Sequence, residues 1–125
     1  MWATNGVAVY TPDGAEWYLY PEITGDGAGG AIIAWSDLRS GDDDTYAQRV
    51  DGNGNVLWTA DGVAISSAED DQYPRKIVSD GGAIIAWLDW RNGNDDIYAQ
   101  RVDADGNVLW TTDGVAICTA EGRQD

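Results

Sequence analysis

The stretch AIIAWSDLRSGDDDTYAQRV (31–50) returns later in the chain as AIIAWLDWRNGNDDIYAQRV (83–102). The residues that follow repeat in the same order, because DGNGNVLWTADGVAI (51–65) matches DADGNVLWTTDGVAI (103–117). About three quarters of the aligned positions are identical at a period of about 52 residues, and such self-similarity is the signature of a repeat architecture. The chain of 125 residues therefore contains two copies of one structural unit.

Each copy contains four short segments with the pattern of β-strands, and no segment has a helical period. The second segment, at 31–37 and 83–89, is apolar on both faces, which predicts a strand covered on both sides. Turns rich in Gly and Asn separate the segments. The other strands are expected at 21–24 and 74–79, at 45–51 and 97–103, and at 56–58 and 108–110, with the last pair continuing into 62–65 and 114–117.

Four antiparallel strands in about 50 residues, repeated and buried on both faces, are typical of the blades of a β-propeller. The predicted fold class is therefore all-β, with two four-stranded antiparallel blades in each chain, and a two-sheet sandwich is the alternative. Blade 1 is expected at 1–57, including an N-terminal edge strand, and blade 2 at 58–109. Residues 110–125 are expected to form an extra edge-strand segment for ring closure or swapping, and their motif also opens the chain at 2–9.

The composition is strongly acidic, with 22 Asp and Glu residues against 7 Lys and Arg residues and a formal net charge of −15. A surface of this charge repels phosphate backbones, so we expect no nucleic-acid partner. The chain has no histidine, which removes the commonest general base and the commonest zinc ligand and disfavours an enzyme. No apolar run of about 18 residues is present, so we expect no membrane insertion. The first residues do not have the pattern of a signal peptide.

The stretch DADGNVLW (103–110) resembles the Asp-box of sialidase-like propellers, with Asp103, Asp105, Asn107 and Trp110 at that spacing. The same residues look like the aspartate-glycine-tryptophan docking motif of quinoprotein-type propeller repeats. More broadly, the repeat is similar to tandem β-propeller repeats of bacterial secreted or surface proteins. The resemblance implies a propeller fold and an extracellular or cell-surface location for the parent protein. It implies no activity, since the sialidase arginine triad and tyrosine nucleophile have no counterparts here.

The same turn raises the question of a calcium site, because Asp103, Asp105 and Asn107 alternate as oxygen ligands would. An EF-hand loop needs Gly at its sixth position and Glu at its twelfth, where this chain has Val108 and Gly114. A hairpin turn whose Asp and Asn side chains cap their own backbone explains the same residues. We therefore expect no metal and no cofactor, with calcium at these three residues as the alternative.

Acidic and arginine side chains recur two residues apart at the ends of the second segments, as Asp37 with Arg39 and Asp89 with Arg91. Residues two apart on a strand share a face, so each pair can form bidentate hydrogen bonds. We expect a structural role that ties the second strand to the third, with recognition of a sugar or carboxylate as the alternative. The residues expected to be structural are Trp35, Trp87, Trp58, Trp110, Asp37, Asp89, Arg49 and Arg101.

Acidic loops at 41–44 and 93–96 lie between the second and third strands and are expected to be solvated turns. The alternative is a rim of carboxylates that binds cations or holds a carbohydrate beside Trp90. The candidate binding residues are Trp90, Arg39, Arg91, Asp43, Asp44, Asp95 and Asp96. Two close carboxylates can also hydrolyse glycosides, so a glycosidase that uses Asp95 or Asp96 is a third hypothesis.

Two blades are too few for a closed ring, which needs at least four. The open face of a four-stranded blade covers about 300 Å², so about 7–8 kcal/mol of apolar burial is unrealised at each end. Head-to-tail contacts between copies close a ring when the rotation permits. We therefore expect a non-catalytic scaffold, a natural fragment or an engineered one, that forms a cyclic homo-oligomer, a trimer ahead of a dimer or tetramer. A lectin-like propeller with a carbohydrate partner is the main alternative.

Overall fold

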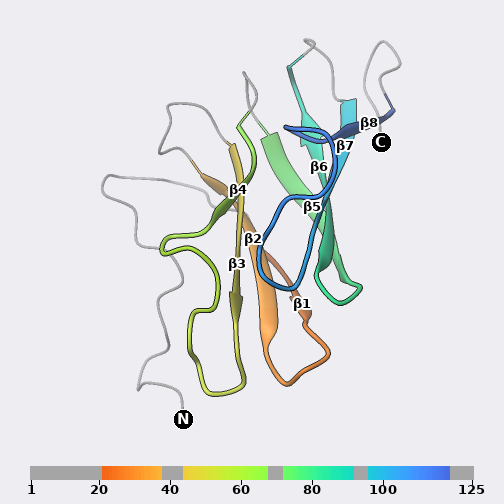
Figure 1. Cartoon of the computed structure of the whole chain (residues 1–125). Helices are drawn as coiled ribbons and strands as arrows, with labels where there is room; N and C mark the ends of the chain where they lie inside the picture. The colour runs from red at the N-terminus through yellow and green to blue at the C-terminus, as the bar shows by residue number, and fades with distance from the viewer. Residues whose placement is uncertain (1–20, 38–43, 68–71, 92–95, 119–125) are drawn as a thin grey trace.

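A computed structural model of the chain describes residues 21–37, 44–67, 72–91 and 96–118. Within these ranges the protein is all-β, with two four-stranded antiparallel sheets and no helix (Figure 1). The strand orders are β1-β2-β3-β4 and β5-β6-β7-β8, so neighbours in sequence are neighbours in each sheet. The strands are β1 (Glu22–Gly25), β2 (Ala31–Asp37), β3 (Asp44–Val50), β4 (Val63–Ser66), β5 (Gln72–Ser79), β6 (Ala83–Asp89), β7 (Asp96–Val102) and β8 (Val115–Cys118).

The second and third strands follow the sequence closely, since β2 and β6 have the predicted bounds and β3 and β7 begin one residue early. The fourth strand was predicted correctly only in its second part, since β4 and β8 lie within one residue of the predicted 62–65 and 114–117, whereas 56–58 and 108–110 form no strand. Val56 and Val108 form only isolated bridges, and the strand proper begins at Val63 or Val115. Between these two points the chain pairs with a glutamine side chain from the third strand and then turns at 59–62, where a backbone hydrogen bond of 2.9 Å closes the turn.

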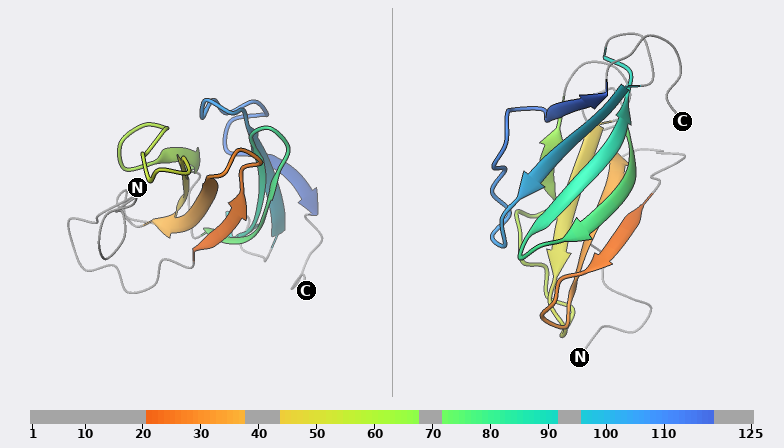
Figure 2. Two further views of the ribbon diagram at one scale, coloured as in Figure 1. Left: turned by 90° about the horizontal axis from the view of Figure 1, so that it is seen from below. Right: turned by 90° about the vertical axis from the view of Figure 1, so that its right-hand side faces the viewer.

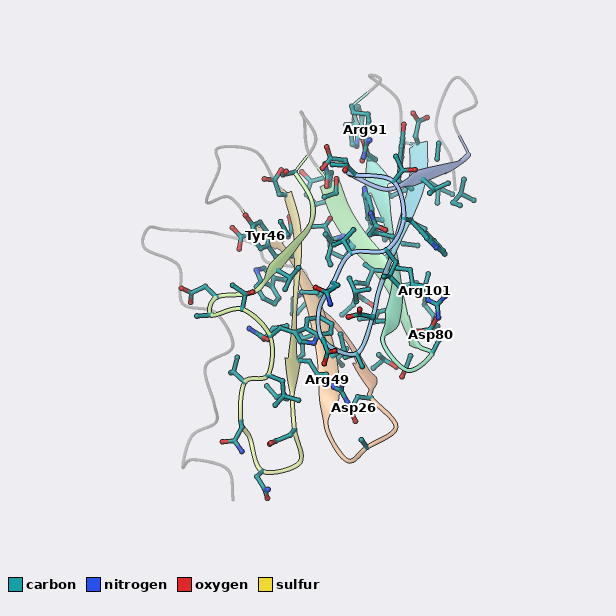
Figure 3. The ribbon with its side chains drawn as sticks, in the orientation of Figure 1. Asp26, Tyr46, Arg49, Asp80, Arg91 and Arg101 are labelled. Atoms are coloured by element: carbon teal, nitrogen blue, oxygen red, sulfur yellow. The ribbon has the colours of Figure 1, made fainter. Side chains whose placement is uncertain are left out.

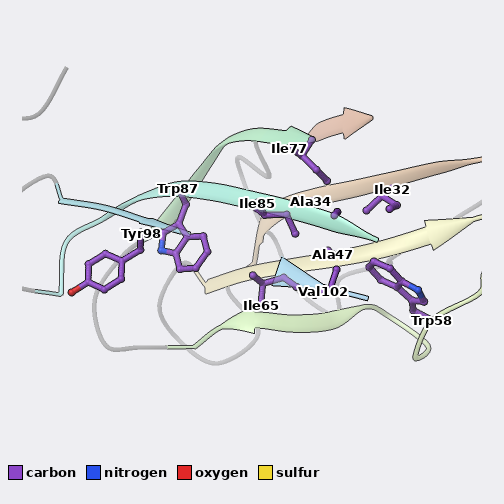
Figure 4. Close-up of a cluster of buried hydrophobic side chains, with 11 residues drawn as sticks. Ile32, Ala34, Ala47, Trp58, Ile65, Ile77, Ile85, Trp87, Tyr98 and Val102 are labelled. Atoms are coloured by element: carbon purple, nitrogen blue, oxygen red, sulfur yellow. The ribbon is translucent and has the colours of Figure 1, made fainter. Parts of the chain in front are cut away.

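The two sheets lie side by side, with their strands along the same general direction (Figures 1 and 2). β5 contacts β1, β2 and β3, and β4 contacts β7. The Ser36 hydroxyl in β2 donates a hydrogen bond of 3.2 Å to the carbonyl oxygen of Gln72 in β5, which places this face of β2 against the second sheet. The buried hydrophobic cluster spans both sheets (Figure 4) and contains Ile32, Ala34, Ala47, Trp58, Ile65, Ile77, Ala83, Ile85, Trp87, Tyr98 and Val102.

The division between the two sheets falls between Ser66 and Gln72, later than the 57/58 division expected from the sequence. Because β4 pairs with β3, the segment that follows residue 57 belongs to the first sheet. β8 likewise pairs with β7, so in this chain it completes the second sheet. The opening motif at 2–9 lies outside the described residues.

Candidate interaction surface

The two sheets meet at a joint between Trp58, in the connection that leads to β4, and the turn 103–107 that follows β7. The Trp58 indole Nε1 donates a hydrogen bond of 2.9 Å to the carbonyl oxygen of Ala104. Arg49 Nη1 donates a second one, of 2.8 Å, to the same oxygen. Gly106 lies over the indole, because a Cβ added there would be 2.8 Å from Trp58 Cγ. We call this arrangement the turn–tryptophan joint.

The turn in the joint is held by its own Asp and Asn side chains. Asp103 Oδ1 accepts hydrogen bonds of 2.9 Å from the backbone amides of Asp105 and Asn107, and its Oδ2 accepts one of 3.0 Å from Asn107 Nδ2. The backbone and side-chain amides of Asn107 lower the pKa of Asp103. The residues considered for calcium thus build the turn, and in the described ranges no three acidic, His or Cys side chains gather as a metal site.

The turn 51–55 of the first sheet has the same internal bonds. Asp51 Oδ1 accepts hydrogen bonds of 2.9 Å from the backbone amides of Asn53 and Asn55, and Asp51 Oδ2 accepts one of 3.0 Å from Asn55 Nδ2. The two amides of Asn55 lower the pKa of Asp51. The φ angle of Gly54 is 85°, close to the 88° of Gly106. Both turns therefore present the same backbone shape.

Asp89 and Arg91 form a bidentate pair at the end of β6. Arg91 Nε lies 2.9 Å from Asp89 Oδ1, and Arg91 Nη2 lies 2.7 Å from Asp89 Oδ2, which also accepts the indole N–H of Trp87 at 2.8 Å. The guanidinium lies 3.7 Å from the ring centroid of Tyr98 and donates to the carbonyl oxygen of Asp113 at 2.6 Å. Burial alone would lower the pKa of Arg91, but its hydrogen bonds to Asp89 raise it. These contacts tie β6 to the connection before β8.

In the first sheet, the Trp35 indole donates to Asp37 Oδ2 at 2.9 Å, as Trp87 does to Asp89. Arg39, the sequence partner of Asp37, lies outside the described residues. The Trp–Asp contact is therefore present in both sheets, whereas the Asp–Arg pair is described only in the second.

Arg49 and Arg101 pair with residues that the sequence did not single out (Figure 3). Arg49 Nε lies 3.0 Å from Asp26 Oδ2, and Arg101 Nε lies 2.9 Å from Asp80 Oδ2. The backbone amides of Ala28 and Gly30, and then Arg49, lower the pKa of Asp26, which burial alone would raise. Each Asp is the first residue of the Gly-rich turn between the first two strands of its sheet. This equivalent position in both repeats is the feature of the sequence from which the two ion pairs could have been predicted.

The candidate rim is not assembled by the described residues. Asp44 and Asp96 are the first residues of β3 and β7 and are buried, opposite Asp37 and Asp89 in the register. The Trp90 side chain is exposed, whereas Arg91 packs on Tyr98. Of the remaining candidate residues, Arg39, Asp43 and Asp95 lie outside the described ranges.

Equivalent side chains of the two sheets differ sharply in exposure on the side of the fourth strand. Ile65 is 1% exposed but its equivalent Ile117 is 60% exposed, and Trp58 is 6% exposed but Trp110 is 38% exposed. Their local sequences are nearly identical, so the difference arises from the neighbouring sheet. The second sheet covers the first sheet here, whereas in the described part of the chain β8 lies at the end of the stack.

On the side of the first strand the difference is reversed. Ile23 pairs with Ile33 in the register, as Ile77 pairs with Ile85, so Ile23 and Ile77 are equivalent. Ile77 is 6% exposed because the first sheet covers it, whereas Ile23 is 67% exposed. The described part of the chain thus has two open faces of different kinds. We define the β1 face by Ile23 and Ile33.

We define the β8 face by Trp110, Thr111, Val115 and Ile117, which line a groove of about 320 Å³. Three of these four side chains are large, apolar and exposed. Contiguous apolar surface of this kind marks sites of protein interaction. The β8 face is therefore the candidate interaction surface of the chain.

No protein-family model, curated protein or solved structure matches this chain. The described part of the chain also offers no helix with the length and hydropathy of a membrane span.

Proposed function

We propose that the chain is a non-catalytic scaffold module whose two sheets are β-propeller blades, and that copies of it assemble head to tail into a closed ring. The observation that carries this proposal is the reciprocal exposure of equivalent residues. Ile117 on the β8 face is open where Ile65 is buried, and Ile23 on the β1 face is open where Ile77 is buried.

The interface inside the chain is a template for the interface between chains. The β8 face repeats the surface that the first sheet offers to the second, and the β1 face repeats the surface that receives it. Placing the β8 face of one copy on the β1 face of the next therefore reproduces a contact that the chain already makes. Such a heterologous contact closes a ring if its rotation permits, and six blades from three copies is the favoured number ahead of four or eight.

The energy of such a contact is of the right order. Burying a large apolar side chain stabilises by about 1.5–3 kcal/mol, so covering Ile23, Trp110 and Ile117 offsets much of an association cost of about 4–15 kcal/mol. In a closed ring every copy uses both of its open faces in contacts with neighbours. In an open dimer each copy uses only one face and leaves the other exposed, so closure is favoured over short open assemblies.

Light scattering and native mass spectrometry test this proposal through the mass in solution. We expect a multiple of 13.4 kDa, with three copies favoured. Ile117→Asn should reduce the assembly to folded single chains. Leu109→Asn is the matched control, because Leu109 is 49% exposed and its equivalent Leu57 is 46% exposed, so neither is covered at a joint. A wild-type protein that is a folded monomer at micromolar concentration would overturn the proposal.

A carbohydrate-binding propeller is the second candidate, and the exposed indole of Trp90 is the observation that favours it. Aromatic side chains such as Trp present an apolar face together with a polar handle, and that combination suits the face of a sugar ring. Glycan-array binding that is lost in Trp90→Ala and kept in Leu109→Asn would support this function. An array on which the wild-type protein binds no glycan would reject it.

A further inference from the structure

We infer that Trp110 and Arg101 form a binding site on the β8 face for a peptide turn of the type Asp-X-Asp-Gly-Asn, supplied by a further repeat unit on another chain. The inference goes beyond the proposed assembly, because it assigns a ligand to the polar part of this face whether or not copies of the chain associate. It rests on a turn that is bound inside the chain and on an equivalent site that lies open.

The bound turn, 103–107, shows which ligand such a site takes. Trp58 Nε1 and Arg49 Nη1 donate hydrogen bonds of 2.9 and 2.8 Å to one acceptor, the carbonyl oxygen of Ala104. A Cβ added at Gly106 would be 2.8 Å from Trp58 Cγ, so the indole lies where a side chain would have to be. A site of this kind therefore recognises one backbone carbonyl and one glycine.

The second sheet has the same two side chains at equivalent positions. Gln100 Oε1 accepts the backbone amide of Trp110 at 2.9 Å, the same distance as in the equivalent bond to Trp58. Arg101 Nε lies 2.9 Å from Asp80 Oδ2, against 3.0 Å in the equivalent ion pair of the first sheet. The backbone therefore holds the indole at the same point in both sheets, and a carboxylate lies beside Nε of each guanidinium.

Both side chains are open to a ligand in the second sheet. Trp110 is exposed where Trp58 is buried, and the Arg101 side chain is 43% exposed, against 15% for Arg49. Within the described ranges neither Trp110 Nε1 nor the Nη groups of Arg101 donate a hydrogen bond. The two donors that share a carbonyl oxygen in the first sheet are therefore available in the second.

The ligand has to come from outside this chain. The turn 103–107 already lies against Trp58, and Gly52 in the turn 51–55 has a contact of its own. A repeat unit of the same type on another chain has the required carbonyl and glycine, and on the β8 face it would continue the interface that the two sheets form inside this chain. Such a unit and a second copy would compete for this face.

The probe is a cyclic peptide with the sequence of residues 101–109, closed by a disulfide between cysteines added at its two ends. These ends are neighbours in the chain, because the amide of Leu109 donates to the carbonyl oxygen of Arg101 at 2.8 Å. A second peptide has Gly106→Asn, since Asn tolerates a left-handed backbone but adds a side chain where the indole must lie. The matched control peptide has Ala104→Gly, which removes an exposed methyl group and keeps the carbonyl oxygen.

Calorimetric titration into the Ile23→Asn chain measures the binding. This variant removes the exposed apolar side chain of the β1 face, so that a second copy does not cover the site. We expect one parent peptide to bind per chain, the Ala104→Gly peptide to bind equally well, and the Gly106→Asn peptide to bind about tenfold more weakly.

Variants of the site provide the second half of the test. In the Ile23→Asn background, Trp110→Ala or Arg101→Gln should weaken the binding of the parent peptide by roughly tenfold or more, because each removes a donor. Arg75→Gln makes the same change of charge at an exposed position and should leave the binding unchanged. Circular dichroism checks that each variant is folded.

Equal binding of the parent and Gly106→Asn peptides, or binding that survives Trp110→Ala, would overturn the inference. A chain that binds no peptide would overturn it as well, and wild-type copies that assemble only with Trp110 present would then assign the site to a second copy. Failure of the proposed function looks different, because the wild-type chain is then a monomer in solution while the peptide still binds.

Discussion

The side-chain oxygen of Gln48 lies 2.9 Å from the backbone nitrogen of Trp58 and accepts its hydrogen bond. The same oxygen accepts from the backbone amide of Arg49 at 3.0 Å, and Gln48 Nε2 donates to the carbonyl oxygen of Thr59 at 2.7 Å. A buried amide side chain therefore satisfies the backbone that a neighbouring strand would otherwise pair with. It also fixes the place from which the Trp58 side chain enters the joint.

Replacing this amide should be costly. Gln48→Leu leaves the buried backbone amide of Trp58 without a partner, at about 1–3 kcal/mol, and removes a part-buried hydrogen bond to the carbonyl oxygen of the exposed Thr59. We therefore expect a loss of about 2–3 kcal/mol in the free energy of unfolding. Gln100→Leu removes the equivalent bonds beside the more exposed Trp110 and should cost less. Urea titrations at one protein concentration measure both, and equal losses would contradict the expectation.

Arg91→Met should destabilise the second sheet. It leaves the fully buried carboxylate of Asp89 without its guanidinium partner, and breaking a buried ion pair from one side costs about 3–5 kcal/mol. The exposed Arg75→Met is the control and should stay within about 0.5 kcal/mol of the wild type. Thermal and urea unfolding report the difference. A small effect at Arg91 would mean that Trp87 and water satisfy Asp89 without it.

Acid should weaken the hairpin turns through Asp103. The folded state holds its carboxylate with a lowered pKa, so the folded chain binds fewer protons than the unfolded chain. The stabilisation is complete above the unfolded pKa of about 3.9 and is lost as the pH falls through the lower folded value. Asp103→Asn keeps one acceptor oxygen but does not titrate. Its unfolding free energy should differ from the wild-type value near neutral pH and converge with it in acid, whereas a constant difference would contradict the assignment.

Gly114→Ala should lower the free energy of unfolding by more than the backbone strain of a positive φ angle accounts for. Gly114 has a φ of 95°, and a Cβ there would lie 2.6 Å from Trp87 Cη2. Gly81 has a φ of 101° with nothing within 4 Å, so Gly81→Ala measures the backbone strain, about 1–2 kcal/mol. We expect Gly114→Ala to lose about 1–3 kcal/mol more, by overpacking against the indole. Equal losses in urea titrations would show that Trp87 moves aside freely.

The sequence predicted best those features that depend on residues close to one another along the chain. The apolar run at 83–88, which ends at Asp89, predicted the bounds of β6, a strand with one buried and one half-buried face. The pair Asp89 and Arg91 could be anticipated because two positions along a strand share a face. The pairing of Arg49 with Asp26 could not, because these residues come from different elements and meet only when the sheet forms. The interruption between 56–58 and β4 could not be predicted for a related reason, since nothing in the hydrophobic pattern indicates that a glutamine side chain pairs with the backbone there.

Ser36 gives the proposed ring an uneven strength. Within the chain its hydroxyl donates a hydrogen bond to the carbonyl oxygen of Gln72, across the interface between the two sheets. The equivalent position in the second sheet is Leu88, which has no hydroxyl. Joints inside a chain would also keep their covalent connection, while joints between chains would not. More stable interfaces within chains and less stable interfaces between chains would then alternate around the ring. On heating or dilution such an oligomer would dissociate at the interfaces between chains and release folded single chains of two sheets each before any sheet unfolds.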